Sequence, residues 1–228
     1  MDIVYAAQAH SLDEFLDAYD SCQANTEVNG RSVLMGALTN VDPSTRGAIA
    51  SRLLDDGADA TTAHGDVNVL HALLGNAALD PGLEAPLLRR LLDQGADVNA
   101  PAIGYGTPLQ LLMSQFAYTD EALAPLYDVL FARGDLDLLM IGGFEKSTYA
   151  MAVKSRRRQG LRSRMDQYLD VHGIEIPEVV RGSGRGRGRT ARASEWQPSS
   201  SFRHPPRPAA ARRPGHPARP CPGSRRAV

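Results

Sequence analysis

The chain has 228 residues, of which 43% are hydrophobic, and this is enough for one domain with an appendage. Its two cysteines, Cys22 and Cys221, lie near opposite ends and match neither a metal-binding spacing nor a disulfide framework. No apolar run reaches the ~18 residues of a membrane span, and no signal peptide is recognisable after Met1. These features predict a cytoplasmic protein that has no membrane-spanning segment.

The net charge of −1 averages two unlike regions. Residues 181–228 contain 12 Arg and one acidic residue, a net charge of +11. The rest of the chain therefore holds 13 basic and 25 acidic residues, a net charge of −12. An acidic body followed by a basic segment predicts different partners for the two regions.

The basic segment is rich in Gly, Pro, Arg and Ala and has few apolar residues that could pack. Such a composition does not bury enough surface to offset the entropy of ordering, so we expect residues 177–228 to be a disordered tail. Two interpretations remain open. Its RGSGRGRGR run is typical of segments that bind nucleic acid phosphates or an acidic partner. Its composition also fits an inert end produced by a frameshift or by readthrough of GC-rich coding sequence.

The body alternates apolar runs of helical period with short polar connections, and no stretch of strand length alternates with period two. LLDDGAD, at residues 53–59, returns as LLDQGAD at residues 91–97. Glycines follow four such runs at intervals of 38, 39 and 39 residues: Gly57, Gly95, Gly134 and Gly173. Since a glycine just past a helix is the usual left-handed cap, each is predicted to end a helix.

Helix starts recur with the same period. Ser32, Asn68, Thr107 and Ser147 each precede an apolar run as N-caps. Ser11, Asp42, Asp80 and Thr119 provide start signals for a second set of helices. The sequence therefore predicts an all-α fold of five helix pairs, at residues 2–20, 32–56, 68–94, 107–133 and 147–172.

TPLQ at Thr107–Gln110, VLHAL at Val69–Leu73 and LLDQGADVNA at Leu91–Ala100 resemble the motifs of ankyrin repeats. The resemblance implies an ankyrin-type helix-pair solenoid of about five repeats over residues 1–176. The repeats depart from the family pattern because their period is 36–40 residues, against about 33 in the family. The motif histidine is present only as His71, which the family pattern assigns to hydrogen bonds between repeats.

The sequence contains only weak matches to motifs for phosphate binding or metal binding. GGFEKST at Gly142–Thr148 has Glu145 where a phosphate-binding loop needs glycine. His64, Asp66 and His71 have no standard zinc spacing, and a structural role is the better interpretation. AIGYGTP at Ala102–Pro108 is predicted to be a hairpin with Tyr105 exposed at its tip. We therefore expect no enzyme activity, metal or cofactor.

The resemblance implies that the protein binds a partner protein through one face of the solenoid and the tips of its connections. The acidic body favours a basic partner, and an inhibitor or toxin-immunity protein is one hypothesis. The alternative is a nucleic-acid-associated adaptor that acts through the Arg-rich tail. We expect a monomer. The partner-binding residues implied by the family are Thr39, Asn40, Thr62, His64, Asp66, Asn76, Ile103, Tyr105, Ser114, Gln115 and Phe144.

Overall fold

The computed structural model describes residues 2–142 and 144–177. Ten α-helices lie within these residues, so the fold is mainly α. The four two-residue strands differ from the predicted all-α fold. The chain divides into two units between residues 182 and 183, and everything described below belongs to the first. The tail predicted from residue 177 onward lies outside the described residues except for Pro177.

The helices come in consecutive pairs whose bounds agree with the predicted ranges to within two residues. The first two connections between pairs contain one 3₁₀ turn (Ser21–Gln23) and two hairpins, β1–β2 (Glu27–Val28, Arg31–Ser32) and β3–β4 (Ala63–His64, Val67–Asn68). The last two contain isolated bridges, Ala102 with Gly106 and Ile141 with Ser147. The pairs are α1–α2 (Ile3–Ala9, Leu12–Ala18), α3–α4 (Val33–Leu38, Pro43–Asp55), α5–α6 (Val69–Leu74, Pro81–Asp93), α7–α8 (Pro108–Met113, Ala124–Phe131) and α9–α10 (Thr148–Lys154, Gln159–Val171).

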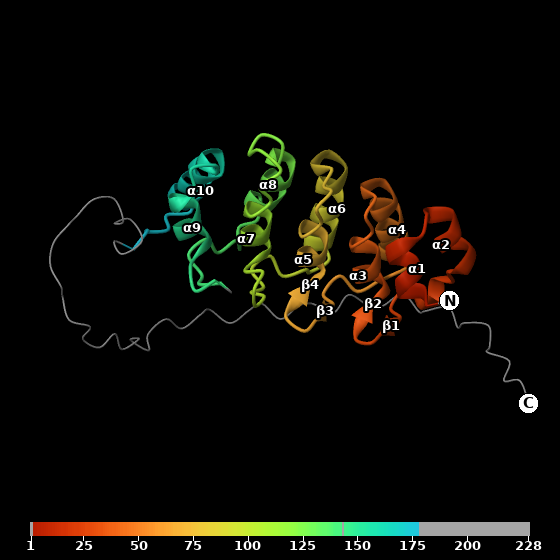
Figure 1. Ribbon diagram of the computed structural model, residues 1–228. Coiled ribbons are helices and arrows are strands. Elements are labelled where there is room, and N and C mark those ends of the chain that lie inside the picture. Colours follow the sequence, from red (N-terminus) through yellow and green to blue (C-terminus); the bar gives the residue numbers. More distant parts are fainter. Residues whose placement is uncertain (1, 143, 178–228) are drawn as a thin grey trace, which may run out of the picture. The chain divides into compact units, whose positions relative to one another are not determined.

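The five pairs stand side by side in a row (Figure 1). The first helices contact one another in the order α1, α3, α5, α7, α9, and the second helices in the order α2, α4, α6, α8, α10. Both hairpins project from the same edge of the row (Figure 1). Each pair therefore buries its apolar faces mainly against its sequence neighbours, as in repeat proteins.

The predicted capping signals explain most helix ends. Ser11 and Glu14 form the predicted capping box, and the side chain of Ser32 accepts from the Met35 amide. Gly57 and Gly95 have positive φ angles of 89° and 102°, which a residue with a Cβ adopts only with strain.

Two of the predicted signals for helix ends and helix starts are wrong. Gly134 does not have a positive φ, because the chain leaves α8 through an ordinary turn. Thr119 does not start α8, which begins at Ala124 without a side-chain cap. The Thr119 hydroxyl instead accepts a hydrogen bond from the Ala122 amide within a turn before the helix.

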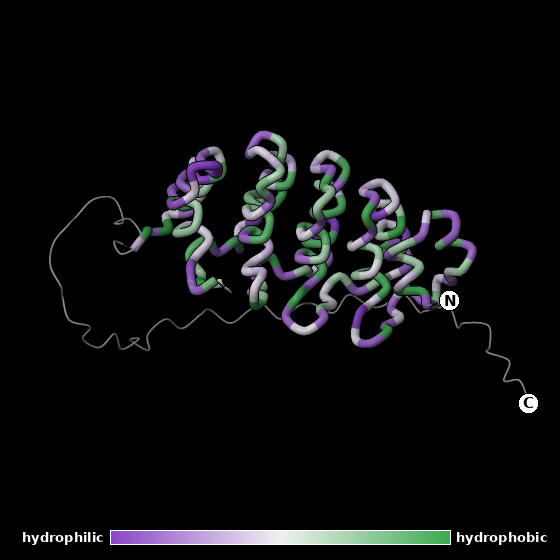
Figure 2. Tube along the Cα trace, in the orientation of Figure 1, coloured by the Kyte–Doolittle hydropathy of each residue, from purple (hydrophilic) through white to green (hydrophobic). Residues whose placement is uncertain are grey.

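The core runs along the row between the two sets of helices and consists mainly of Leu, Ala and Val. Figure 2 shows the hydrophobic residues within each pair and hydrophilic residues at the connections. At one point the helices touch through backbone. A Cβ on Gly36 in α3 would lie 2.6 Å from the carbonyl oxygen of Val4 in α1. The close approach of α1 and α3 therefore depends on this glycine.

Buried arginines join neighbouring pairs at the loops between first and second helices. Arg46 in α4 and Glu84 in α6 form an ion pair in which both side chains are at most 1% exposed. Arg158 forms the matching contact at the other end of the row, with Asp120 at 3.2 Å. The Asp120 carboxylate also accepts from the Leu161 amide, at 3.0 Å, in the first turn of α10.

Candidate functional site

A groove of about 390 Å³ crosses the second, third and fourth helix pairs. We call it the Tyr105 groove. Four of the predicted partner-binding residues line it: Thr39, His64, Asn76 and Tyr105. Its remaining surface comes from Arg31 and Val67 on the hairpins, from Met35, His71, Ala72 and Leu111 on the first helices, and from Gly75, which caps the end of α5.

Hydrogen bonds between hairpins hold the rim of the Tyr105 groove. His64 donates from Nδ1 to the Gly30 carbonyl, 3.1 Å away on the preceding hairpin. Tyr105 lies at the tip of the next connection, which is closed by a bridge between Ala102 and Gly106. Its side chain is 51% exposed, as the sequence predicts. The rim thus presents an aromatic ring on a tightly closed turn.

Arg31 brings positive charge to one end of the groove. Its guanidinium donates to the Gln8 side chain at 3.1 Å and to the hydroxyl of Thr39. The Thr39 hydroxyl in turn donates to the Gly36 carbonyl at 2.9 Å. Both polar side chains are therefore held in place by hydrogen bonds within the chain.

The floor of the groove is small and apolar. Ala72 and Gly75 leave space between Met35 and Leu111, and a Cβ on Gly75 would lie only 2.8 Å from the His71 carbonyl oxygen. Asn76 closes the floor by donating its amide to the Leu38, Ala72 and Leu73 carbonyls, each at 2.8 Å. Its amide oxygen makes no hydrogen bond within the described part of the chain.

His71 is a structural residue beneath the groove. It is 3% exposed, and its Nε2 donates to the Gly106 carbonyl in the next connection at 2.9 Å. Its Nδ1 accepts from the Asn68 amide at 3.3 Å. Burial lowers the pKa of His71, and the hydrogen bond to Gly106 opposes this shift. The predicted role of His71 in bonding between repeats is confirmed, and no group of three or more His, Cys, Asp or Glu residues poised for a metal occurs among the described residues.

Four further predicted residues lie on the connections outside the groove. Thr62 contacts the Ser32 hydroxyl at 3.1 Å, and the Asp66 carboxylate accepts from the Ile103 amide of the next connection. Ile103 is 85% exposed. The ring of Phe144 lies close to Gly106, where a Cβ would approach it to 2.8 Å. These residues extend the exposed rim beyond Tyr105.

The remaining predicted residues, Asn40, Ser114 and Gln115, follow the first helices and form hydrogen bonds in the loops between paired helices. The prediction that Asn40 is available to a partner is wrong. Asn40 is 3% exposed because its amide donates to the Ala7 and His10 carbonyls of the preceding pair, each at 3.1 Å. Gln115 makes equivalent bonds to the carbonyls of Leu74 and Asn76, and the Ser114 hydroxyl donates to its own helix. Polar residues that follow the first helices therefore form hydrogen bonds between neighbouring helix pairs.

Sequence reasoning missed Arg31, Met35 and Leu111 in the groove. Arg31 comes before a helix start and lies within a hairpin too short to give a period-two signal. Met35 occupies the place of the motif histidine, and Leu111 lies within an apolar run. The repeat alignment could have identified Met35, since its equivalent is His71, another groove residue.

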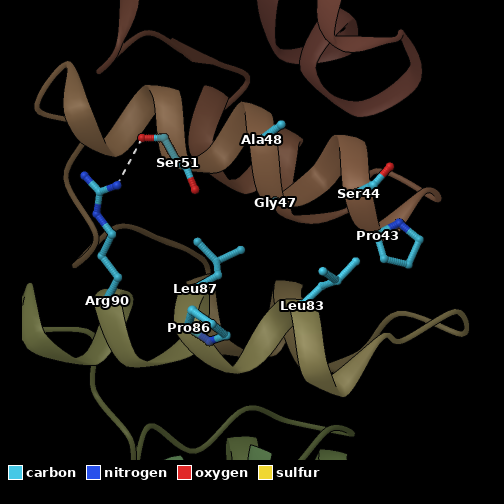
Figure 3. Close-up of a pocket in the computed structure, with 9 residues that line it drawn as sticks. All are labelled: Pro43, Ser44, Gly47, Ala48, Ser51, Leu83, Pro86, Leu87 and Arg90. Atoms are coloured by element: carbon cyan, nitrogen blue, oxygen red, sulfur yellow. Dashed lines mark hydrogen bonds between the residues drawn. The ribbon is translucent and has the colours of Figure 1, made fainter.

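A second groove, of about 410 Å³, lies between α4 and α6 (Figure 3). We call it the Pro86 groove. Leu83 and Pro86 on α6 face α4, where Gly47 and Ala48 leave room, and Leu83 is 57% exposed. Arg90 closes one end by donating to the Ser51 carbonyl at 3.2 Å. Apolar side chains dominate this groove, and it contains none of the predicted partner-binding residues.

Neither a family model nor a curated protein matches this chain. One solved structure is similar, the crystal structure of a functionally unknown protein from Leptotrichia buccalis. It aligns with a TM-score of 0.62 and 18% identity, over 76% of this chain and 96% of the other. The likeness therefore concerns the fold alone. Among the described helices, none combines the length and apolar character that a bilayer crossing requires.

Proposed function

We propose that this chain is an ankyrin-type solenoid that binds a partner protein through the Tyr105 groove. The observation that carries the proposal is convergence: Thr39, His64, Asn76 and Tyr105, from separate helix pairs and connections, line one groove. Repeat proteins use such continuous surfaces across several repeats for binding. The groove has no catalytic constellation among its described residues, so a binding role agrees with its chemistry.

The floor of the groove favours an apolar anchor, and the net charge of the body favours a basic partner. The floor of Met35, Ala72 and Leu111 fits an apolar side chain, and Tyr105 supplies a large contact area at low entropic cost. The body of the chain carries a net charge of −12, which attracts basic proteins and repels nucleic acid. This charge supports the hypothesis of an inhibitor or immunity protein for a basic toxin, acting in the cytoplasm.

The test is capture from cells of the source organism with three forms of the full chain. Wild type and Tyr105→Ala are compared with Val41→Ala, which removes an 80% exposed side chain outside the groove. The proposal expects a protein retained by wild type and Val41→Ala but not by Tyr105→Ala. Equal retention by all three forms would place the binding surface elsewhere.

The alternative, an adaptor that binds nucleic acid through residues 181–228, rests on the 12 arginines of that segment. These residues lie outside the described part of the chain. Nucleic acid retained by the full chain and lost when these arginines are replaced would support this alternative.

A further inference from the structure

The two ends of the row carry opposite charge. Residues 2–30 contain six acidic residues and no Lys or Arg, whereas residues 146–164 contain seven Lys or Arg and no acidic residue. Figure 2 shows long hydrophilic stretches on the first and the last helix pair. A charge separation of this kind favours contacts between unlike ends of two molecules.

The basic end has an open cavity of about 490 Å³ between the fourth and fifth helix pairs. We call it the Phe116 cavity. Phe116 is 64% exposed, and Arg156 and Arg157 line the cavity beside it. Glu121 lies on the rim. An exposed aromatic ring next to two arginines is typical of a contact surface for a partner with acidic and apolar groups.

Arg156 and Arg157 are available for a partner. Neither makes an ion pair with a described residue, although Arg46, Arg90 and Arg133 elsewhere in the row are paired. The next residue, Arg158, is 1% exposed and binds inward. Three consecutive arginines thus divide into one that holds the fold and two that face outward.

The cavity wall is fixed by buried bonds. Arg158 donates to the Gln115 carbonyl at 2.7 Å and to the Tyr118 carbonyl at 3.0 Å, which come before and after Phe116 in the chain. The Tyr118 hydroxyl accepts from the Leu79 amide of the preceding pair at 2.7 Å. A wall held on both sides presents Phe116 without a large ordering cost.

The acidic end supplies a complementary helix face. Asp13, Leu16 and Asp17 lie on one face of α2, since they are three and four residues apart. Asp13 and Asp17 are exposed and make no ion pair with another described residue, and Leu16 is 37% exposed. An apolar side chain beside two carboxylates is complementary to an aromatic ring beside two arginines.

We propose that the Phe116 cavity receives α2 of a second copy of this chain. Leu16 then packs against Phe116, while Asp13 and Asp17 approach Arg156 and Arg157. The contact joins two different faces, so it forms in each direction within a closed pair or continues along a chain of copies. It is separate from the Tyr105 groove, and it revises the monomer expected from the sequence. Because exposed ion pairs contribute little each, the association is weak and salt-dependent.

A nucleic acid is the less favoured occupant. Nucleic acid binding needs a continuous basic track, and here Asp120 and Glu121 line the same cavity as the two arginines. The association with a second copy needs no charges beyond those of the chain itself.

The experiment is sedimentation of the full chain over a range of concentrations under reducing conditions, at about 50 mM and about 500 mM NaCl. Arg156→Glu/Arg157→Glu and Asp13→Arg/Asp17→Arg each reverse one side of the contact. Arg89→Glu/Lys146→Glu is the matched control, because it makes the same charge change as the first variant at exposed residues outside the cavity.

The proposal expects wild type and control to gain mass with concentration at low salt. Each reversed variant alone should associate about tenfold more weakly or not at all, and mixing the two should restore association. A wild type that stays monomeric at low salt would overturn the proposal, as would single-stranded RNA bound through Arg156 and Arg157 without self-association. Loss of association in Asp13→Arg/Asp17→Arg but not in Arg156→Glu/Arg157→Glu would also overturn it, and would identify the Arg-rich residues 181–228 as the partner of α2.

Discussion

Arg46 and Glu84 occupy the same position in successive second helices and form a buried ion pair. Each is the fourth residue of a helix that begins with Pro after an Asp N-cap, and they are 38 residues apart. Arg46 Nε lies 2.7 Å from Glu84 Oε1, and the guanidinium also donates to the Asn40 and Ala78 carbonyls. Burial raises the pKa of Glu84, and the Arg46 guanidinium opposes that rise. Opposite charges at equivalent positions therefore join the second helix pair to the third.

Removing one partner of this ion pair should be strongly destabilising. Arg46→Met leaves the Glu84 carboxylate buried without its cation, and we expect it to lower the free energy of unfolding by about 3–5 kcal/mol. Arg46→Met/Glu84→Leu should recover most of that loss, because no buried charge remains. Urea unfolding of wild type, Arg46→Met and Arg46→Met/Glu84→Leu measures these changes in the free energy of unfolding. A double variant no more stable than Arg46→Met would show that the pair itself, rather than an unpaired charge, determines stability.

Replacing His71 with Gln should weaken the dependence of stability on pH. Gln110 occupies the equivalent position and makes the same bonds, accepting from the Thr107 amide at 3.0 Å and donating to the Lys146 carbonyl at 2.8 Å. His71→Gln should therefore fold with a change of about 1 kcal/mol or less.

The pH effect follows from the lowered pKa of His71. As the pH falls below about 6.5, the unfolded chain takes up the proton first, so the stability provided by neutral His71 is complete above that pH and is lost below it. Urea unfolding at about pH 7.5 and about pH 5.5 should show a smaller loss on acidification for His71→Gln than for wild type. Equal losses would mean that other groups cause the dependence.

Two helical glycines should respond in opposite directions to the same substitution. A Cβ at Gly36 would lie 2.6 Å from the Val4 carbonyl oxygen, so Gly36→Ala should destabilise by about 1–3 kcal/mol. At Gly47 nothing lies within 4 Å of a Cβ, so Gly47→Ala should stabilise by about 0.5–1 kcal/mol. Thermal unfolding of both variants and of wild type checks these two predictions. A stabilising Gly36→Ala would show that α1 moves away from α3 at little cost.

The repeat period of the sequence predicts the five helix pairs, because caps are local signals. Ser32, Asn68, Thr107 and Ser147 each cap a helix through their own side chains. Where a helix depends on tertiary contacts, local signals fail. The start of α8 lacks a side-chain cap, and the first turn of α10 is capped from another pair, because the Asp120 carboxylate accepts from the Leu161 amide.

The groove is predicted less completely than the fold. Tyr105 is predictable as an exposed tip because it lies between two glycines, Gly104 and Gly106. Asn40 looks exposed in the sequence, since it is a polar residue in a loop, but the preceding helix pair covers it. The ion pairs of Arg46 and Arg158 also depend on neighbours 38 residues away in the chain, which no local pattern shows.

The most direct test of the proposed binding function is the affinity of a captured partner for wild type and Tyr105→Ala, measured by calorimetry, with thermal unfolding of both proteins. Tyr105 is half-exposed, and its hydroxyl makes no hydrogen bond to a described residue, so its removal should leave thermal stability unchanged. We expect the dissociation constant to rise about tenfold or more, as for an aromatic anchor. An unchanged dissociation constant with unchanged stability would contradict the account and remove the Tyr105 groove as the binding surface.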